Sequence, residues 1–345
     1  MDCAVFLQAF QRTILGFEVI LYLIGKSVVR KVRRQMDEES EGELVRYFVW
    51  EGMTVMIKIN GKTRTCGLIG YPVEHTLSPV IHNTLAEQMG HDLVYVPFPV
   101  EPGRVQDAVK GADALQILGL NVTVPYKSEV IGCLQEIDPL AERIGAVNTL
   151  VRMDGGYKGY NTDMEGLYRA MKGEGIKIEC EEIILLGAGG AARAVAHLCA
   201  VKGAAKVYML NRTLDKAEAV AMEVNRLAGR EVVCPMTLQQ YDRIPCGKYL
   251  AVQGTSVGLS PHDENVVIQD RAFYEKIHTG FDLIYNPWET RFMRLVQECG
   301  GRAYNGLKML LYQGIIAYEL WNDVHVPEEN AQIVYEKLKE QFVKK

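Results

Sequence analysis

One glycine-rich turn, Gly187-Ala188-Gly189-Gly190-Ala191-Ala192, limits the fold of this chain more than any other stretch. The aliphatic run Ile183–Leu186 before it is typical of a buried strand, and the residues from Ala191 to Lys202 after it favour a helix. The spacing G-x-G-x-x-A between strand and helix indicates a dinucleotide site. The first glycine permits the turn, the second lets a pyrophosphate approach the helix N-terminus, and the small third residue allows close packing. An ordinary strand-to-helix turn is the alternative.

Strand and helix patterns alternate along the chain in two sets, which favours mainly parallel sheets covered by helices. The first set ends in a predicted hairpin around Asp154-Gly155-Gly156, and the second predicts a doubly wound cofactor domain. The expected strands are Thr65–Gly70, Leu93–Pro97, Gly119–Val124, Val147–Arg152, Tyr157–Tyr160, Ile183–Leu186, Lys206–Leu210, Glu231–Cys234, Tyr249–Val252 and Phe281–Ile284. The expected helices are Pro79–Met89, Val105–Leu118, two short stretches between Lys127 and Ile144, Ala191–Lys202, Leu214–Ala228, Trp288–Cys299, Leu307–Trp321 and Pro327–Val343. The last two could close over either domain.

The length and charge of the chain exclude several classes of protein. With 345 residues it can hold two domains with substantial cores. A formal net charge of -5, spread along the chain, gives no basic face for nucleic acid. No stretch of about 18 uninterrupted apolar residues predicts a membrane span. The 8 cysteines lack C-x-x-C spacing and no zinc pattern is present, so we expect reduced thiols in a cytoplasmic protein without a metal.

Residues 1–55 differ from the rest of the chain. Ile14–Val29 is apolar but contains charged residues, and a basic stretch from Arg30 to Arg34 follows it. A signal peptide would carry its positive charges before the apolar run, so secretion is not indicated. Two interpretations remain: an amphipathic helix that docks on a partner or membrane surface, and a non-native upstream segment with true initiation near Met53 or Met56. The second is slightly favoured, because the periodic pattern begins only after this segment.

A tripeptide after the second strand of the cofactor set, Asn211-Arg212-Thr213, indicates which dinucleotide binds. An enzyme that uses NAD places an acid here, about 20 residues beyond the glycines, to bind the ribose 2′-hydroxyl. An arginine suits a 2′-phosphate instead, since its planar fork donates paired hydrogen bonds to phosphate oxygens. We therefore expect NADP. The alternative is that Asn211 or Thr213 caps the next helix and Arg212 is solvated.

Three polar clusters precede the cofactor domain, and packing alone explains them poorly. The first, Leu68–Pro79, puts two hydroxyls beside a helix start, although its serine before proline is also a good N-cap. The second, Asn121–Lys127, places Asn, Thr and Lys at a strand end, where open α/β sheets bind ligands. The third pairs Asn148 with Asp163, which could also cap the helix that follows it.

Together and in this order, the clusters resemble the shikimate dehydrogenase family. The similarity runs from about Met56 to the C-terminus, and residues 1–55 lie outside the family core. The matching segments are Gly70–Asn83 (G-x-P-x-x-H-S-x-S-P-x-x-H-N), Asn121–Lys127 (N-V-T-x-P-x-K), Gly145–Thr149 (G-A-V-N-T), Asn161–Gly166 (N-T-D-x-x-G), the glycine turn, Asn211-Arg212-Thr213, Tyr285-Asn286-Pro287, and Gly306–Leu310 with Gln313. This chain departs from the family in Thr76, where serine is usual, and in Gln253-Gly254-Thr255-Ser256, where Asn-Ala-Thr-Ser is usual.

The resemblance implies reversible, NADPH-dependent reduction of 3-dehydroshikimate to shikimate, on the pathway to chorismate and the aromatic amino acids. It implies that Lys127 and Asp163 are the catalytic pair and that Thr76 and Ser78 hold the substrate carboxylate. Residues that would contact the ring hydroxyls or line the pocket are Asn121, Thr123, Asn148, Tyr285 and Gln313. Residues that would bind the cofactor are Gly187, Ala188, Gly189, Gly190, Ala191, Ala192, Asn211, Arg212, Thr213, Leu283 and Gly306.

The resemblance also implies a domain organisation. Residues 56–162 and 307–345 would form an α/β substrate-binding catalytic domain, with the C-terminal helices packed back on it. Residues 163–306 would form a Rossmann NADP-binding domain, and the substrate would lie in the cleft between the two. The oligomeric state is not readable from the sequence, and a homodimer is one option.

The chemistry of the reaction fits the two proposed catalytic residues. Hydride arriving at a ketone carbon puts negative charge on the oxygen, so the ammonium of Lys127 can stabilise that charge and supply the proton. The carboxylate of Asp163 can orient Lys127 and accept a hydrogen bond from a substrate hydroxyl. Two alternatives stay open. The extra methyl of Thr76 could favour a quinate or dual quinate/shikimate dehydrogenase that accepts NAD, and a non-catalytic paralogue could bind the same ligand as a sensor.

Overall fold

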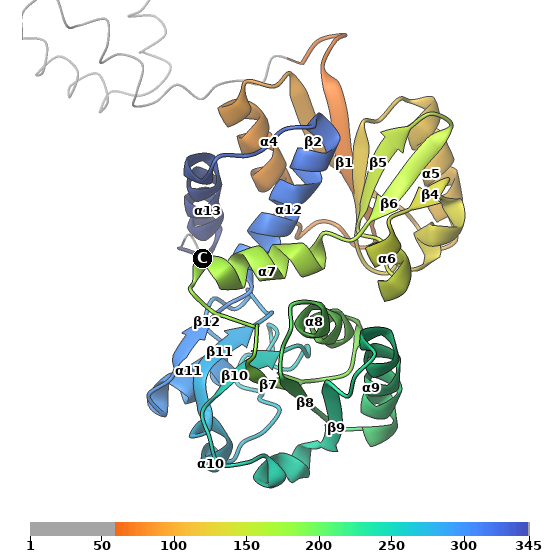
Figure 1. The fold of residues 1–345 in the computed structure, drawn as a ribbon. Coiled ribbons are helices and arrows are strands. Elements are labelled where there is room, and N and C mark those ends of the chain that lie inside the picture. Colours follow the sequence, from red (N-terminus) through yellow and green to blue (C-terminus); the bar gives the residue numbers. More distant parts are fainter. Residues whose placement is uncertain (1–58, 344–345) are drawn as a thin grey trace, which may run out of the picture. The chain divides into compact units, whose positions relative to one another are not determined.

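The computed structural model describes residues 59–343. The N-terminal segment, with both interpretations offered for it, lies outside the described residues. Within them, Figure 1 shows two sheets, each flanked by helices, with helix α7 (Asp163–Gly173) running between the two halves.

The later half of the described chain forms a 6-stranded, wholly parallel sheet in the order β12-β11-β10-β7-β8-β9. Its first strand in sequence lies in the middle, which gives the doubly wound arrangement expected for a dinucleotide-binding domain. The strands are β7 (Glu182–Leu186), β8 (Lys206–Asn211), β9 (Val233–Thr237), β10 (Tyr249–Gln253), β11 (Ile277–Asp282) and β12 (Arg302–Tyr304). The helices are α8 (Gly190–Val201), α9 (Leu214–Ala228), the 3-10 helix η2 (Leu238–Arg243), α10 (Arg271–Tyr274) and α11 (Arg291–Glu298).

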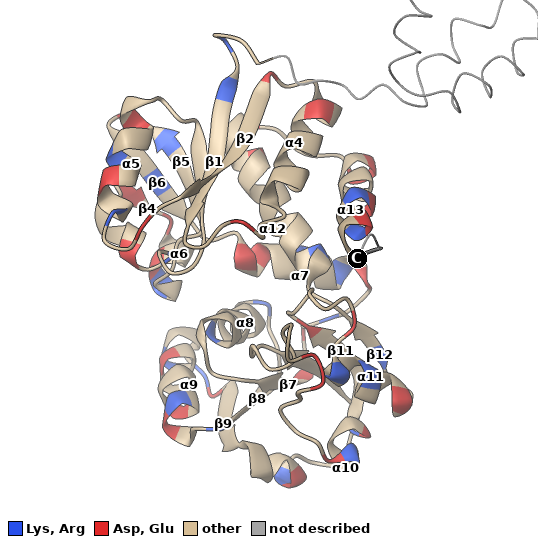
Figure 2. Ribbon diagram, turned by 180° about the vertical axis from the view of Figure 1, so that it is seen from behind, with Lys and Arg blue, Asp and Glu red and all other residues tan. Residues whose placement is uncertain are grey.

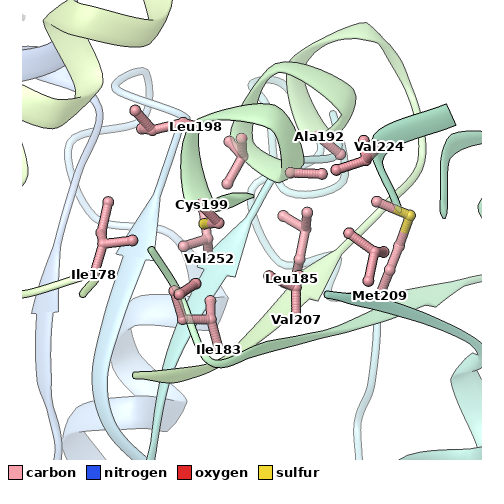
Figure 3. Close-up of a cluster of buried hydrophobic side chains, with 14 of the residues drawn as sticks. Ile178, Ile183, Leu185, Ala192, Leu198, Cys199, Val207, Met209, Val224 and Val252 are labelled. Atoms are coloured by element: carbon pink, nitrogen blue, oxygen red, sulfur yellow. The ribbon is translucent and has the colours of Figure 1, made fainter. Parts of the chain in front are cut away.

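The sequence of β7 explains its central position. Ile183 and Leu185 are buried in the core shared with α8 and α9, whereas Ile184 and Leu186 are buried in the core shared with α10 and α11. A strand with both faces covered needs a continuous apolar run, and β7 has one. Figure 3 shows the first of these cores, where side chains of α8, α9 and three strands meet: Leu185, Ala192, Leu198, Cys199, Val207, Val224 and Val252.

The earlier half forms a mixed sheet in the order β2-β1-β3-β5-β6-β4. Strand β1 pairs in parallel with β2 and β3, but β5 runs antiparallel to both β3 and β6. The hairpin predicted around Gly155 is confirmed, and it adds an antiparallel part to this sheet. Three of the five strand pairs are parallel, β1 with β2, β1 with β3 and β4 with β6, so the expectation of a mainly parallel sheet holds here too. The strands are β1 (Arg64–Gly70), β2 (Leu93–Pro99), β3 (Gly119–Val122), β4 (Glu136–Ile137), β5 (Thr149–Met153) and β6 (Gly156–Tyr160).

Helices cover both faces of this mixed sheet. One core contains apolar residues of α4 (Ser78–Met89), α12 (Leu307–Asn322) and α13 (Glu328–Val343). The other contains residues of α5 (Val105–Ala114), the 3-10 helix η1 (Glu129–Cys133) and α6 (Pro139–Ile144). The two C-terminal helices therefore pack back on the first sheet, as the resemblance implied, and Figure 1 shows α12 and α13 beside α4.

Several expected boundaries are wrong in the earlier half. The helix expected over Val105–Leu118 ends at Ala114, because Gln116 has a φ of 57°, a left-handed conformation that no α-helix continues. The strand expected to reach Val124 ends at Val122. Strand β4, of only 2 residues, was not expected at all, since so short an edge strand leaves no periodic pattern.

Boundaries also shift in the later half. The strand expected over Phe281–Ile284 occupies Ile277–Asp282, and the one expected over Glu231–Cys234 occupies Val233–Thr237. The helix expected from Trp288 begins at Arg291, where the side chain of Thr290 accepts a capping hydrogen bond from the backbone of Met293. Strand β12, of 3 residues, was also not expected.

Helix α7 holds the two halves together through a close crossing. Its residues Met164 and Leu167 belong to the core of the parallel sheet, yet its outer side meets α12 of the first half. A Cβ added at Gly166 would lie 2.7 Å from the backbone nitrogen of Gln313, so the crossing requires a glycine. This contact fixes α12 against the start of α7.

Charged side chains are mixed over the surface. Figure 2 shows Lys and Arg interspersed with Asp and Glu on the outer helices of both halves. Among residues 59–343, no helix has the length and apolarity needed to span a bilayer.

Candidate active site

A cavity of about 390 Å³ lies between the carboxyl ends of β1 and β3, the start of α7, helix α12 and the loop after β11. The sequence analysis assigned nine residues to catalysis or substrate binding, and the cavity brings all of them together: Thr76, Ser78, Asn121, Thr123, Lys127, Asn148, Asp163, Tyr285 and Gln313. They come from segments far apart in the chain. The fold thus gathers every polar cluster that packing alone did not explain.

Lys127 and Asp163 form an ion pair in this cavity. Lys127 Nζ donates to Asp163 Oδ2 at 2.6 Å, and the two side chains keep 35% and 21% of their surface exposed. The backbone of Lys127 is fixed because its carbonyl accepts a hydrogen bond from Val147 N at 2.7 Å. Asp163 is the first residue of α7, but it does not cap that helix, since the N-cap position belongs to Thr162. Its carboxylate instead faces the cavity.

Asn148 joins the ion pair to the floor of the cavity. It is buried, and its Nδ2 donates to Asp163 Oδ1 at 2.9 Å, while its Oδ1 accepts from the backbone of Thr162 at 2.8 Å. Asn121 lies opposite Thr149 in the antiparallel register of β3 and β5, and its Nδ2 donates to Thr149 Oγ1 at 3.2 Å. The amide of Asn148 is therefore held in one orientation, because the carboxylate of Asp163 can only accept and the backbone N–H of Thr162 can only donate.

The two hydroxyls of the first cluster lie together at the start of α4. Thr76 Oγ1 donates to Ser78 Oγ at 3.1 Å, and Ser78 is buried. The prediction that Ser78 could cap the helix is wrong, because the helix already begins at Ser78 and Leu77 holds the cap position without a side-chain bond. Each hydroxyl carries one O–H donor, so the two together can donate to one carboxylate.

Close backbone packing shapes two other walls of the cavity. A Cβ at Gly70 would lie 2.3 Å from Thr123 Cγ2, so glycine at the end of β1 makes room for the Thr123 side chain. Gln313 reaches the cavity because α12 crosses α7 closely at Gly166. Tyr285, from the loop after β11, is partly buried and closes the side toward the cofactor sheet.

The glycine turn lies at the carboxyl end of β7 and leads into α8. Gly187 has a φ of 106°, which favours glycine, and an added Cβ would lie 2.8 Å from Thr255 Cγ2. Gly189 and Gly190 are exposed, and an added Cβ at either would meet no atom within 4 Å. The first N–H groups of α8 have no intrahelical acceptor and point into this space. The turn therefore fits a phosphate group.

Ala188, Ala191 and Ala192 complete the turn with different surroundings. Ala188 is half-buried and Ala191 is exposed, whereas Ala192 is fully buried. A Cβ at Gly254 would come within 3.1 Å of the Ala192 Cβ, so small residues at both positions let α8 approach β10. This is the close packing that the third small residue of the motif predicts.

Asn211 is the last residue of β8, and Arg212 and Thr213 follow it at the same carboxyl end of the sheet as the glycine turn. The side chain of Asn211 donates to the carbonyl of Thr213 at 2.7 Å. Thr213 holds the N-cap position of α9, but its side chain makes no capping bond. Arg212 is exposed and no partner for it is found among residues 59–343. The guanidinium is free to bind a phosphate.

Leu283 and Gly306 connect the cofactor edge with the cavity. Both line the cavity, and a Cβ at Gly306 would lie 2.1 Å from the Leu283 carbonyl oxygen. Glycine is needed there because the chain passes directly over the backbone of Leu283. A nicotinamide ring extending from the glycine turn to the cavity would pass this point.

Hydrogen bonds support the loop Gln253-Gly254-Thr255-Ser256, which departs from the usual family sequence. Gln253 Oε1 accepts from Thr255 N at 2.6 Å, and its Nε2 donates to Val257 O at 3.1 Å. Its Nε2 also lies 3.4 Å from Oδ1 of Asp282, a fully buried carboxyl group that accepts from Thr290 Oγ1 at 2.6 Å. Burial raises the pKa of Asp282 to about 7. Gln253 and Asp282 therefore stabilise the loop, and Asp282 was not identified from the sequence.

Sequence reasoning also missed the residues behind Asn121. His82 and Tyr95 are both buried, and both hydrogen-bond with Asn121 Oδ1. The available signal for His82 was its place in the motif over Gly70–Asn83, where it is a polar residue within a predicted helix. Within residues 59–343, no group of three or more His, Cys, Asp or Glu side chains could hold a metal ion.

Comparisons with known proteins agree with this arrangement. A family profile described as shikimate dehydrogenase substrate binding domain matches residues 68–150, and one described as shikimate / quinate 5-dehydrogenase matches residues 170–241. A shikimate dehydrogenase (NADP+) of Desulforamulus reducens is 41% identical over 285 residues, covering 78% of this chain and 94% of that protein.

Solved structures show the same fold. A shikimate dehydrogenase crystallised in complex with NADP+ is 37% identical, with a TM-score of 0.73 over 81% of this chain and 96% of that one. The shikimate 5-dehydrogenase of Listeria monocytogenes, crystallised with shikimate and NAD, is 30% identical, with a TM-score of 0.75 over 81% of this chain and 98% of that one. Sequence, fold and cavity agree: the chain belongs to the shikimate dehydrogenase family.

Proposed function

We propose that this protein catalyses the reversible, NADPH-dependent reduction of 3-dehydroshikimate to shikimate, a step toward chorismate and the aromatic amino acids. The observation that carries the proposal is the Lys127–Asp163 ion pair, with an N–O distance of 2.6 Å, in a cavity that also contains Thr76 and Ser78. A charged pair beside hydroxyl and amide donors suits a small, anionic, polyhydroxylated ring.

Lys127 carries the proton in this scheme. NADPH, when bound at the glycine turn, supplies the hydride for the ketone carbon. As negative charge develops on the ketone oxygen, the Lys127 ammonium stabilises it and donates a proton to form the hydroxyl. Asp163 orients Lys127 and accepts a hydrogen bond from a neighbouring substrate hydroxyl. In the reverse direction Lys127 accepts the proton.

The remaining residues of the cavity orient the substrate. Thr76 and Ser78 donate to its carboxylate, and the ring hydroxyls meet Asn121, Thr123, Asn148, Tyr285 and Gln313. Holding the ring in this way converts the reaction into a step between aligned groups, which lowers the entropic part of the barrier.

The cofactor is NADP, and Arg212 selects it. The guanidinium is exposed beside the glycine turn and has no carboxylate partner among residues 59–343, so it can bind a 2′-phosphate. The pyrophosphate is held by the residues of the glycine turn: Gly187, Ala188, Gly189, Gly190, Ala191 and Ala192. Arg212 is flanked by Asn211 and Thr213, and the nicotinamide end of the cofactor meets Leu283 and Gly306.

We assign residues 56–162 and 307–345 to the substrate domain and residues 163–306 to the cofactor domain. We also propose that the enzyme works in the cytoplasm, in keeping with free thiols at all seven described cysteines: Cys66, Cys133, Cys180, Cys199, Cys234, Cys246 and Cys299. A homodimer is the assembly that we expect, and sedimentation of the purified protein would test it.

Quinate dehydrogenase activity is the second candidate. The Thr76 methyl stands at the carboxylate end of the cavity, where shikimate and quinate differ in the group beside the carboxylate. A non-catalytic ligand sensor is less well supported, since a sensor needs the pocket but not the ion pair.

The deciding experiment follows nicotinamide absorbance in four mixtures of purified protein. Shikimate and quinate are each combined with NADP+ and with NAD+. Fast reduction with shikimate and NADP+ supports the proposal, whereas a strong preference for quinate with NAD+ would move the assignment to quinate dehydrogenase. Silence of folded protein in all four mixtures would favour the sensor.

A further inference from the structure

A buried polar chain leads from the cavity into the core behind it. Its first member, Asn121, is 4% exposed. Asn121 Oδ1 accepts from the Tyr95 hydroxyl at 2.7 Å and lies 3.1 Å from His82 Nε2. Asn121 Nδ2 donates to Thr149 Oγ1 and, at 3.4 Å, to the carbonyl of Asn148. His82 therefore stands at the inner end of the chain, on the side away from the cavity.

The chain continues without a break to the ion pair. Thr149 Oγ1 donates to Asn148 Oδ1 at 3.1 Å, and Asn148 Nδ2 donates to Asp163 Oδ1 at 2.9 Å. The other oxygen of Asp163 receives Lys127 Nζ. Each link joins one donor to one acceptor, so His82 and the ion pair belong to one hydrogen-bonded network.

The direction of the bonds fixes the proton on His82. The Asn148 carbonyl can only accept, so the nitrogen of the Asn121 amide faces it and the oxygen of that amide faces His82. His82 Nε2 must then carry a hydrogen and donate it. His82 Nδ1 is buried and has no hydrogen-bond partner among the described residues, as befits the unprotonated nitrogen of a neutral ring. Burial lowers the pKa of His82 to about 3, in agreement with a neutral ring.

Packing holds the His82 ring in place for this bond. The ring is 0% exposed and stacks on Tyr95 with 4.2 Å between ring centroids. The Trp321 ring is tilted against it, with 4.9 Å between centroids. A histidine in such a site could serve packing alone. However, an apolar residue in place of His82 would remove one of the two donors to Asn121 Oδ1. An amide in that position gains freedom to turn over.

We propose that His82 is a positioning residue for catalysis: its Nε2–H bond fixes the Asn121 amide, and through Thr149 and Asn148 it keeps Asp163 aligned with Lys127. This inference rests on the proposed function of the cavity. His82 itself is fully buried and does not line the cavity, so we assign it no direct part in the chemical step.

The test compares His82→Leu with His82→Gln in steady-state assays with shikimate and NADP+. Leucine has a similar volume but no donor, whereas glutamine places an N–H near the position of Nε2. We expect His82→Leu to lower kcat about tenfold, the loss typical of one buried hydrogen bond, with the KM for NADP+ within about twofold. We expect His82→Gln to recover most of kcat.

A matched control separates positioning from stability. Leu85→Ala removes a fully buried side chain from the same helix and the same core, without touching the polar chain. We expect it to lower Tm while kcat stays unchanged below the unfolding transition. If His82→Leu retains wild-type kcat, or if His82→Gln is no better than His82→Leu, the inference is overturned.

A second variant keeps the test decisive if His82→Leu does not fold. Tyr95→Phe removes the other donor to the same Asn121 oxygen and keeps the ring. A lower kcat with unchanged KM for NADP+ supports the chain, and a wild-type kcat contradicts it. Failure of the proposed function would look different, since the wild-type protein itself would then not turn over shikimate with NADP+.

Discussion

The substrate side and the cofactor side of the site are built in opposite ways. On the substrate side, Asn121, Asn148, Asp163 and Lys127 are hydrogen-bonded to one another and are buried or half-buried. On the cofactor side, the exposed turn around Gly189 presents backbone N–H groups to open space, and the side chain of Arg212 is exposed. One side is held by hydrogen bonds among its own side chains, and the other leaves its donors open to a ligand.

The chemistry of each task explains the difference. Proton transfer requires donor and acceptor to lie within hydrogen-bond reach of the substrate, so the groups that do it benefit from a rigid network. Phosphate binding depends on charge and on N–H groups at a helix N-terminus, which tolerate more movement. Substitutions on the substrate side should therefore lower kcat, and those on the cofactor side should raise the KM for the cofactor.

The largest effect should come from Lys127→Ala. We expect kcat to fall about 100-fold to 10,000-fold, because the charge interaction strengthens as the oxyanion develops, while the KM for shikimate changes little. Steady-state kinetics measures both values. The control is Lys158→Ala, which removes another lysine paired with a carboxylate, Glu136 at 3.2 Å, outside the cavity lining. Equal losses of kcat in the two variants would contradict the catalytic role of Lys127.

The next effect concerns the only carboxyl group among residues 59–343 whose pKa rises to about 7, Asp282 beneath the cofactor loop. An unfolded Asp has a pKa of about 3.9, so between the two values the folded protein binds the proton more tightly and the free energy of unfolding falls as pH rises. At about 1.4 kcal/mol per pH unit, the fall could reach about 4 kcal/mol and is complete above pH about 7.

Urea unfolding of wild type and Asp282→Asn between pH 4.5 and 7.5 measures this fall. The amide cannot ionise, so the variant should lose most of the slope. A slope of the same size in both proteins would assign the pH dependence to other groups. This result sharpens the comparison, because it would show that the cofactor side also contains a buried ionisable group, Asp282, beneath the loop Gln253–Ser256.

Arg212→Ala should have a smaller effect, and only on the cofactor. Hydrogen bonds to charged groups contribute about 1.5–3 kcal/mol, so the KM for NADPH should rise roughly tenfold to 100-fold while the KM for NADH stays nearly constant. Arg226→Ala, at an exposed arginine on α9, is the matched control. Equal weakening of both cofactors by Arg212→Ala would refute the 2′-phosphate assignment.

The smallest expected effect separates two glycines of one turn. Gly187→Ala should lower the free energy of unfolding by about 1–3 kcal/mol, because its φ of 106° strains any other residue. Gly189→Ala should change stability by less than about 0.5 kcal/mol, since its Cβ would meet no neighbour, yet it should weaken NADPH binding. Thermal unfolding and a fluorescence titration measure the two quantities. A Gly189→Ala variant that binds NADPH normally would place the pyrophosphate elsewhere.

The sequence predicted the cofactor half better than the substrate half. The strand before Gly187 is apolar throughout and the glycines mark its end, so local residues specify that element. The strand order of the first sheet depends on the pairing of the β5–β6 hairpin with β3. That pairing is a long-range contact, so local sequence patterns do not predict it. Edge strands β4 and β12 are too short for any period.

The site shows the same division. Polar residues at strand ends, such as Asn121 and Lys127, were predictable, because little else explains them there. The roles of His82 and Asp282 were not predicted, although His82 lies within a matching motif, because the fold decides which polar groups they meet. Motifs reveal the groups that face the ligand more readily than the groups that hold them.

The place of α12 has a consequence for the order in which the molecule is completed. One core of the first sheet contains Leu311, Ile315 and Val334, which come from the last two helices. The buried residues in the two cores of the parallel sheet end earlier in the chain, at Phe281 in one and at Val296 in the other. A chain made from its N-terminus can therefore finish its second sheet before its first. Until α12 docks, Gln313 is missing from the cavity, so an incomplete chain could already hold a nucleotide while it still lacks a place for the ring to be reduced.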